Sequence, residues 1–512
     1  MTDDNNDEVE LKLAIDGAFS LPDLTDDGAV AEVRQEESQD LWATYWDTAD
    51  LRLARHGVTL RRRTGEPGGP RWTLKLPLPV DDPQAADGNG ILARREIEMK
   101  GGADRVPARA ADLVTAYART APLTEIAQLR TRRRIWSLVD AEGRSVAMLD
   151  DDEVSVMEHG RRISRFRELE LESQGLDVEH LQRIAGLLRS AGAVDAEPIP
   201  KVVRALGPAA TAPADAVPPE IGPEHPAGAA VRAALTEAVD RIVQHDAGMR
   251  MGDVESLHQA RVGLRRLRSH LRVFGPLLDA RWAEALNSEL RGLARQLGEV
   301  RDLDVLIDRL GAIAADLRPV VDPLLDGLAR RREADRGALL ERLRDERYAA
   351  LLERLVAAAA APRLLRAASK PAGSVLPPLF DAAWKRLAKH GEQMSPAWTD
   401  ADYHELRIRA KRARYAADAI GPALDGARRD GADAIRKRLA ALQTILGELQ
   451  DAATSREEIL ASAARHPENG PFNLAAGITL EREVQRANAA RKAVPDAWRD
   501  LRRPKLRRWV TA

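Results

Sequence analysis

With 512 residues, the chain is too long for one hydrophobic core, which predicts about two or three domains. Its 78 Lys and Arg residues nearly balance its 80 Asp and Glu residues, so a chain that coats nucleic acid along its whole length is excluded. The absence of cysteine excludes disulfides and thiolate metal sites. An acidic N-terminal stretch, with no apolar run of about 18 residues anywhere, predicts a soluble, cytoplasmic protein.

The first element predicted is a strand at residues 8–16, EVELKLAID. Apolar residues alternate there with charged ones, which is the period of a half-buried strand. The same alternation recurs in later segments, where one face is apolar and the other is rich in either cations or acids. These segments are residues 57–64, 71–77, 93–99, 128–136, 145–153 and 166–173.

The charged faces of these strands are segregated by sign, whereas an ordinary solvated sheet would mix charged residues with Ser and Thr. A closed antiparallel barrel of about eight strands could turn every charged face inward as a tunnel, with helices at 104–118 and 177–193 covering the apolar outside. Carboxylates suit Mg²⁺ or Mn²⁺, and cations suit phosphate oxygens. The cations are Lys12, Arg61, Arg63, Lys75, Arg94, Arg130 and Arg132, and the acids are Glu8, Glu10, Glu96, Glu98, Asp150, Glu168, Glu170 and Glu172.

The order of these segments resembles a CYTH domain of the triphosphate tunnel metalloenzymes over about residues 5–206. The resemblance is carried by the Glu8-x-Glu10-x-Lys12 opening, the run YWDTADLRLARHGVTLRRR, the LKLP, REIE, LRTR and ELELE segments, and IPKVVRA. It implies a β-barrel that binds a triphosphate and Mg or Mn. Family activities are inorganic triphosphatase, thiamine triphosphatase and adenylyl cyclase.

Site residues follow from this resemblance, position by position. It implies catalytic roles for Glu8, Glu10 and Lys12. Metal ligands would be Glu8, Glu10, Asp150, Glu170 and Glu172. Substrate-binding residues would be Lys12, Arg61, Arg63, Lys75, Arg94, Arg130, Arg132 and Lys201.

A change of composition divides the chain. Residues 207–228 contain six prolines and no Lys or Arg, which predicts an extended linker. The domains expected are therefore 1–206 and 229–512. The second is rich in Ala, Leu, Arg and Glu at helical spacing, which predicts a bundle of about ten helices with breaks around 275, 319–323, 362–378 and 421.

The second domain contains an internal repeat. HQARVGLRRLR at 258–268 recurs as HELRIRAKRAR at 404–414, and LGEVRDLD at 297–304 recurs as LGELQDAA at 446–453, so a duplicated helical unit is expected. In each copy the cations form one helical stripe beside an apolar face. The first stripe contains no aromatic residue on which a base could stack, which disfavours single-stranded nucleic acid. A bundle core explains the apolar face better than a membrane surface does, so a polymer of phosphates is the ligand that fits best.

This half resembles a CHAD domain, the conserved histidine α-helical family, over about residues 229–510. The resemblance implies a pseudo-twofold helical bundle with a basic groove for inorganic polyphosphate. Lys411 stands where the first copy has Arg265, and protonated histidines near neutral pH would add charge. The implied polyphosphate-binding residues are His258, Arg261, Arg265, Arg268, Arg272, His404, Arg407, Lys411, Arg412 and Arg414.

Together these expectations describe an α+β multidomain protein: an antiparallel β-barrel tunnel that hydrolyses inorganic triphosphate, followed by an all-α domain that binds polyphosphate. Partners would be these phosphates, with no nucleic acid and no membrane; association with polyphosphate granules is compatible with them. One alternative is a non-catalytic polyphosphate-binding or granule-associated protein whose tunnel only senses its ligand. Another is an ATP-using cyclase or nucleotidase, which would need a base-recognition pocket that no motif supplies.

Overall fold

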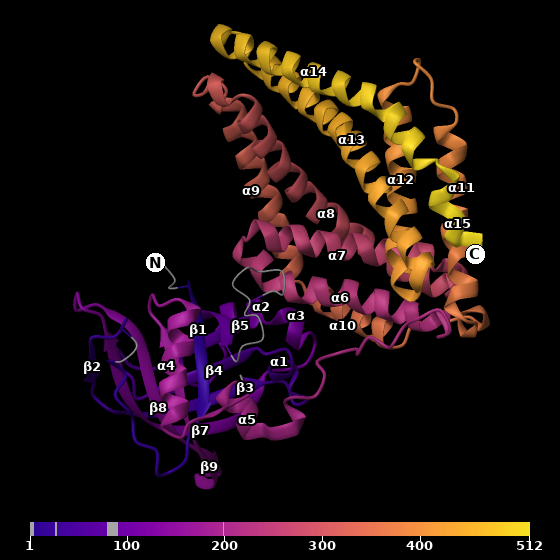
Figure 1. Ribbon diagram of the computed structural model, residues 1–512. Helices are drawn as coiled ribbons and strands as arrows, with labels where there is room; N and C mark the ends of the chain where they lie inside the picture. The colour runs from indigo at the N-terminus through magenta and orange to yellow at the C-terminus, as the bar shows by residue number, and fades with distance from the viewer. Residues whose placement is uncertain (1–4, 26–27, 79–90, 198, 512) are drawn as a thin grey trace. The chain divides into compact units, whose positions relative to one another are not determined.

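The computed structural model describes residues 5–25, 28–78, 91–197 and 199–511 (Figure 1). It splits into two compact units, Met1–Ala214 and Asp215–Ala512, and their boundary falls inside the proline-rich segment 207–228. The first unit is built on an antiparallel sheet and the second is helical, which confirms the predicted α+β fold class. Among the described helices, each is too short or too polar to cross a membrane.

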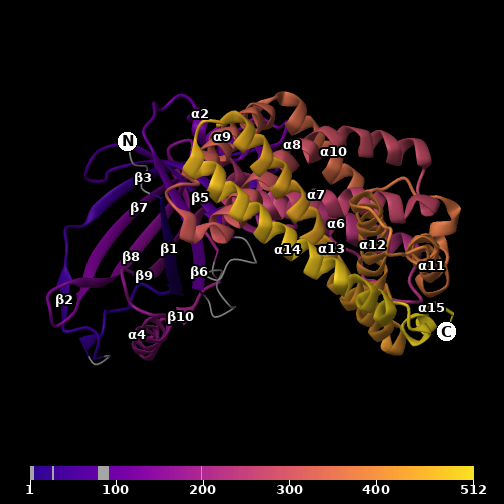
Figure 2. The ribbon, with the colours of Figure 1, turned by 90° about the horizontal axis from the view of Figure 1, so that it is seen from above.

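The sheet of the first unit closes on itself. Its strands follow the order β1-β6-β5-β4-β3-β7-β8-β9, and β9 pairs back with β1, so the two ends of the order meet. Figure 2 shows several of these strands side by side. The strands are β1 (Asn5–Ala14), β3 (Gln39–Asp47), β4 (Thr59–Thr64), β5 (Arg71–Pro77), β6 (Ile91–Met99), β7 (Thr124–Val139), β8 (Ser145–Glu158) and β9 (Arg161–Ser173), with β2 (Glu32–Gln35) on β7 and β10 (Val194–Asp195) on β1.

Helix α4 (Val178–Ser190) covers part of the apolar outside of this barrel. It begins after Asp177, whose carboxylate accepts a hydrogen bond from the His180 backbone at 2.9 Å. Its buried residues Leu181 and Leu188 belong to one core with outward-facing leucines of β1, β8 and β9. The other helices of this unit are α1 (Arg52–Arg55), α2 (Ala108–Leu113), α3 (Thr115–Ala118) and α5 (Lys201–Leu206).

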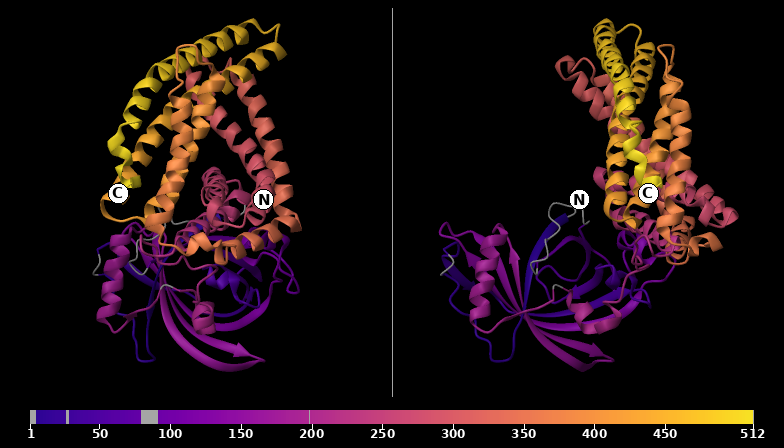
Figure 3. Two further views of the ribbon diagram at one scale, coloured as in Figure 1. Left: turned by 90° about the vertical axis from the view of Figure 1, so that its right-hand side faces the viewer. Right: turned by 45° about the vertical axis from the view of Figure 1, so that its right-hand side comes forward.

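The second unit repeats one helical pattern. Helix α7 leads through the short 3₁₀ turn Gly275–Leu277 into α8, and α12 leads through the turn Gly421–Ala423 into α13. Long helices pair as α8 with α9 and α13 with α14, which Figure 3 shows from two further sides. The helices are α6 (Ala227–Met251), α7 (Val254–Val273), α8 (Ala280–Ile313), α9 (Asp322–Arg344), α10 (Glu346–Ala360), α11 (Ala372–Gly391), α12 (Asp400–Ile420), α13 (Gly426–Arg465), α14 (Gly470–Leu501) and α15 (Arg508–Thr511).

Equivalent residues of the two copies meet where α6 and α11 begin. The backbone of Ala227 donates to Lys370 at 2.9 Å, and that of Ala372 donates to His225 at 2.8 Å. These two hydrogen bonds exchange the same positions of the two copies, which is the pattern expected at a local twofold axis. The unit therefore folds as two related halves joined at their centre.

The apolar seam between α4 and the barrel generates a stability prediction. Leu188→Ala removes a fully buried side chain and should lower the free energy of unfolding of the first unit by about 2–5 kcal/mol. Val178→Ala, at a position 48% exposed on the same helix, is the matched control and should change it by less than about 1 kcal/mol. Urea unfolding of the full chain, followed by hydrogen exchange of each unit, checks both values.

Candidate functional site

The lumen of the barrel is lined almost entirely by charged and polar side chains. They come from β1, β3, β4, β5, β6, β7, β8 and β9 and from the start of α5, so residues far apart in the sequence converge on one tunnel. The lining residues are Glu10, Lys12, Tyr45, Thr59, Arg61, Arg63, Lys75, Arg94, Glu96, Arg133, Asp150, Glu170, Glu172, Pro200 and Lys201.

Strand alternation explains why these side chains point inward. On β1, Leu11 and Leu13 pack outward against the α4 core, so the residues between and beside them must face the lumen. Glu10 and Lys12 are each only 3% exposed. Because both faces of the strand are covered, charge on the inner face is removed from bulk water and has to find a partner inside the protein.

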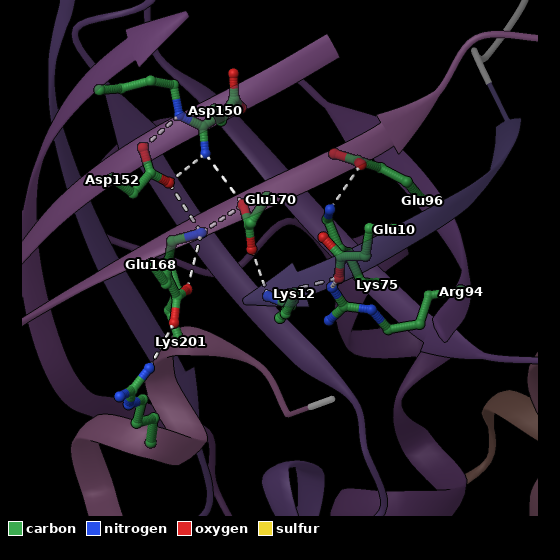
Figure 4. A network of polar contacts seen from close by, with 12 residues as sticks. Glu10, Lys12, Lys75, Arg94, Glu96, Asp150, Asp152, Glu168, Glu170 and Lys201 are labelled. Carbon is green, nitrogen blue, oxygen red and sulfur yellow. Dashed lines mark hydrogen bonds and ion pairs between the residues drawn. The ribbon is translucent and has the colours of Figure 1, made fainter. Parts of the chain in front are cut away.

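Around Glu10, that partner is supplied by basic residues of neighbouring strands (Figure 4). Arg94 donates to Glu10 at 2.5 Å, and the Lys12 ammonium lies 3.7 Å from the same carboxylate while also bonding to Glu170. Lys75 pairs with Glu96 at 3.1 Å. The pairings of Arg94 with Glu10, Lys12 with Glu170 and Lys75 with Glu96 join side chains of different strands, so the network also fixes the register of the barrel wall.

A second cluster surrounds Lys201, the first residue of α5. Its ammonium lies 2.9 Å from Asp152 and 3.2 Å from Glu168, and it also pairs with Glu170. Arg133 of β7 donates to Asp152 at 2.7 Å and to Glu170 at 3.3 Å, and also pairs with Asp150. The acids of this part of the lumen are thus shared among several cations.

The electrostatics of the network differ from one carboxyl group to the next. Burial alone would raise the pKa of Glu10, but Lys12 and Arg94 outweigh it and lower that pKa to about 2. For Asp150, burial outweighs the effect of the Arg133 guanidinium and raises the pKa to about 6. The Asp150 Oδ1 atom is also buried without a hydrogen-bond partner among the described residues. Asp150 is therefore a buried carboxyl group of this lumen whose charge is only partly compensated.

The donor set fits a hard divalent cation. The strand register places Glu10 opposite Glu172 and Asp150 opposite Glu170, and carboxylates facing each other across a sheet repel unless a cation lies between them. Within the described residues, no group of three or more metal donors is already gathered, because Lys and Arg side chains lie among the acids. The side chain of Glu8, also predicted as a ligand, lies outside the described part of the structure.

Arg130 and Arg132 do not line the lumen, so their predicted placement is corrected. Arg130 lies on the outer face, donates to Asp40 at 2.9 Å and stacks over Trp42 at 5.4 Å, and Arg132 is exposed. Arg133 takes the inner position instead. The other predicted substrate-binding residues, Lys12, Arg61, Arg63, Lys75, Arg94 and Lys201, line the tunnel.

Sequence reasoning also missed Tyr45, Thr59 and Asp152. Tyr45 lies inside because β3 alternates like its neighbours, and the Arg61 guanidinium outweighs burial and lowers the pKa of its hydroxyl. Asp152 could have been found, since it shares the parity of Asp150 in the DDD run.

The second unit contains a basic groove where α7 packs against α12. Its lining includes Leu264, Ser269, Ala294, Ile408 and Tyr415. The lining also includes six of the predicted polyphosphate-binding cations: Arg261, Arg265, Arg268, Arg272, Lys411 and Arg412.

Several of these cations lack counter-ions. Arg261 pairs with Asp302 at 2.8 Å, but Arg265, Arg272, Lys411 and Arg412 have no carboxylate within ion-pair distance among the described side chains. Burial, together with neighbouring cations, lowers the pKa of Lys411 to about 8 and also lowers that of Arg265. Uncompensated, partly desolvated cations in a groove are what an anion site requires.

The remaining predicted residues lie beside the groove lining. Arg407 and Arg414 are close enough to lower the pKa of Lys411, and the His404 ring bonds to the Gln450 side chain. Burial and Arg301 lower the pKa of His258, which disfavours the extra positive charge predicted for this histidine.

Comparison with known proteins identifies both units. Residues 6–194 match the CYTH domain family and residues 233–460 match the CHAD domain family. Uncharacterized proteins from two strains of Mycobacterium tuberculosis are each 32% identical over 526 residues, which covers 96% of this chain and 96% of each relative.

Solved structures similar to single units were also found. The CHAD domain of the plant Ricinus communis is 26% identical, with a TM-score of 0.47, over 56% of this chain and 96% of that chain. A Hippeastrum protein described as an adenylyl cyclase candidate with a dominant triphosphatase activity is 18% identical, with a TM-score of 0.24, over 40% of this chain and 98% of that chain.

The first unit is thus a triphosphate tunnel domain and the second a helical domain of the conserved histidine type. The chain belongs to the CYTH-CHAD family, together with its two mycobacterial relatives. Some CYTH members are triphosphatases or cyclases, and the tunnel proteins generally depend on a divalent metal.

The corrected orientation of β7 makes a direct prediction. Arg133→Gln removes the buried cation that pairs with Asp150, Asp152 and Glu170, leaving Lys201 to pair with Asp152 and Glu170, and should lower the free energy of unfolding by about 3–5 kcal/mol. Arg132→Gln, one residue away on the exposed face, should cost less than about 0.5 kcal/mol. Equal losses in chemical denaturation would contradict the assignment of inner and outer faces.

Proposed function

We propose that the first unit is a divalent-metal-dependent hydrolase of inorganic triphosphate and that the second unit binds inorganic polyphosphate. The observation that carries this proposal is the set of seven cations and five carboxylates that line one closed barrel. A triphosphate could replace the acids as partner of the Lys and Arg residues, while a metal ion could replace the cations as partner of the acids.

The basic residues would bind the phosphoryl oxygens, with Arg133 in the place expected for Arg130 and Arg132. Glu10, Glu170, Glu172 and Asp150 would hold the metal together with Glu8. When bound, the metal would polarise a phosphoryl oxygen and lower the pKa of a coordinated water. Lys12, 3% exposed between Glu10 and Glu170, would stabilise charge that develops on the leaving phosphate.

The composition of the lumen favours inorganic triphosphate over a nucleotide. Apart from Tyr45 and Pro200, the lining residues are charged or hydroxyl-bearing, so the lumen offers little surface for a base. The basic groove of the second unit supports a related ligand, since its uncompensated cations would bind a chain of phosphates. Association with polyphosphate granules is part of this proposal.

Activity is tested by phosphate release from inorganic triphosphate, ATP and long-chain polyphosphate with Mg²⁺ or Mn²⁺. Glu172→Gln should lower kcat/KM for triphosphate by about a hundredfold or more, because it removes a carboxylate opposite Glu10. Glu153→Gln, at a position on β8 whose side chain is 39% exposed, keeps the charge change but should leave the rate unchanged. Absence of release from every substrate with either metal would refute the enzyme and leave a binding protein.

The groove predicts a pH dependence of polyphosphate binding. Since the pKa of Lys411 is lowered to about 8, the side chain loses its charge as pH rises through that value, and a bound polyanion opposes this loss. Affinity measured by titration calorimetry should therefore weaken between pH 7 and about pH 9.5.

Lys411→Met should bind more weakly at pH 7 and lose most of this pH dependence. The control is Lys437→Met, which removes the same charge from an exposed position outside the groove lining and should keep the wild-type pH profile. An unchanged profile in Lys411→Met would assign the titration to another group.

A further inference from the structure

Tyr415 is the aromatic residue of the basic groove, and two arginines hold its ring. The guanidinium of Arg265, from α7, lies 5.7 Å from the ring centroid, and that of Arg414, from the same helix as Tyr415, lies 4.9 Å away. The residue is 5% exposed and lines the groove together with Lys411. Its position is therefore fixed by cation–π contacts at the crossing of the two basic helices.

The hydroxyl of Tyr415 has no such support. Its oxygen is buried and finds no hydrogen-bond partner among the described residues. A buried hydroxyl that is left unpaired lowers stability, so tyrosine is a worse choice than phenylalanine here unless something outside the chain accepts its hydrogen bond. The Arg265 and Lys411 side chains have no acceptor atom, so neither can accept a hydrogen bond from the Tyr415 hydroxyl.

The other half of the repeat provides an internal comparison. The offset that relates His258 to His404 relates Ser269 to Tyr415, and both residues line the groove. The Ser269 hydroxyl donates to the backbone oxygen of Arg265 at 2.8 Å, so it is satisfied within the protein. The two halves of the groove thus differ at equivalent positions, and the free donor belongs to the second half.

We infer that Tyr415, Arg265 and Lys411 form a subsite for one phosphoryl group, in which the Tyr415 hydroxyl donates to a non-bridging oxygen. A phosphate that draws the Arg265 guanidinium away from the ring would open the path to the hydroxyl. Because Ser269 stands at the equivalent position, the twofold-related halves are not equal binding surfaces, and this subsite anchors the polyphosphate chain at one place. The inference rests on the proposed polyphosphate binding and names the residue that anchors it.

Tyr415→Phe tests the subsite in the full chain, because it removes the hydroxyl and keeps the ring between its two arginines. The Kd for inorganic polyphosphate should rise about tenfold or more, the effect of losing one hydrogen bond to a charged oxygen. The Tm without ligand should stay the same or increase, since an unpaired buried hydroxyl is removed. If Tyr415 had only a structural role, the substitution would instead lower Tm or leave both Tm and Kd unchanged.

Tyr403→Phe makes the same change on the same helix but outside the groove lining, so it is the matched control, and its affinity for polyphosphate should equal that of the wild type. If the wild type binds polyphosphate and Tyr415→Phe binds it equally tightly, the subsite is refuted while the proposed function stands. If the wild type binds no polyphosphate, the proposed function itself fails and the subsite with it. Weaker binding in Tyr415→Phe at unchanged Tm supports the subsite.

Discussion

Pairing of buried charges across the lumen is the constraint on which the first unit depends. The closed sheet leaves β1 covered on both sides, so Glu10 and Lys12 can remain ionised only where opposite charges meet them. Leu11 and Leu13, which alternate with Glu10 and Lys12 along β1, pack against α4. The same alternation therefore forms both the hydrophobic seam and the charged tunnel. A shift of one residue in any strand would reverse both surfaces at once.

The second unit handles positive charge differently. Its groove lies where α7 and α12 meet, and most of its cations have no carboxylate partner among the side chains that the structure describes. The pKa of Lys411 is lowered because its charge is buried beside other cations. The pKa of Glu10 is lowered because Lys12 and Arg94 compensate its charge inside the tunnel. Under the proposed function, the tunnel would exchange its internal ion-pair partners for a short substrate and a metal ion, whereas the cations of the open groove would bind a long polymer.

Much of this arrangement could be predicted from the sequence, because alternation and repetition are local patterns. The strands, the covering helix α4 and the duplicated helices follow from them. Strand β7 shows where the reasoning fails. It carries arginines at 130, 132, 133 and 134, and both of its faces contain apolar residues, so the inner parity could not be decided within the strand itself. Only the acids on neighbouring strands identify Arg133 as the inner residue.

The aromatic residues were missed for a related reason. Tyr45 and Tyr415 each fit the apolar spacing of a core, and nothing local reveals whether a tyrosine hydroxyl meets a partner in the folded chain. Their surroundings depend on contacts between distant strands or between the two halves of the repeat. Burial without a partner is a property of the fold, and it becomes visible only in the structure.

The most direct measurement is calorimetric binding of inorganic triphosphate to the full chain, with and without Ca²⁺ as a metal expected to bind without supporting rapid hydrolysis. Each lumenal cation that binds a phosphate oxygen leaves a carboxylate without its partner, and the metal ion can then balance that carboxylate. The metal should therefore strengthen triphosphate binding about tenfold or more, and triphosphate should strengthen metal binding by the same factor. Equal affinity for triphosphate in the presence and absence of metal would contradict the exchange of partners inside the tunnel.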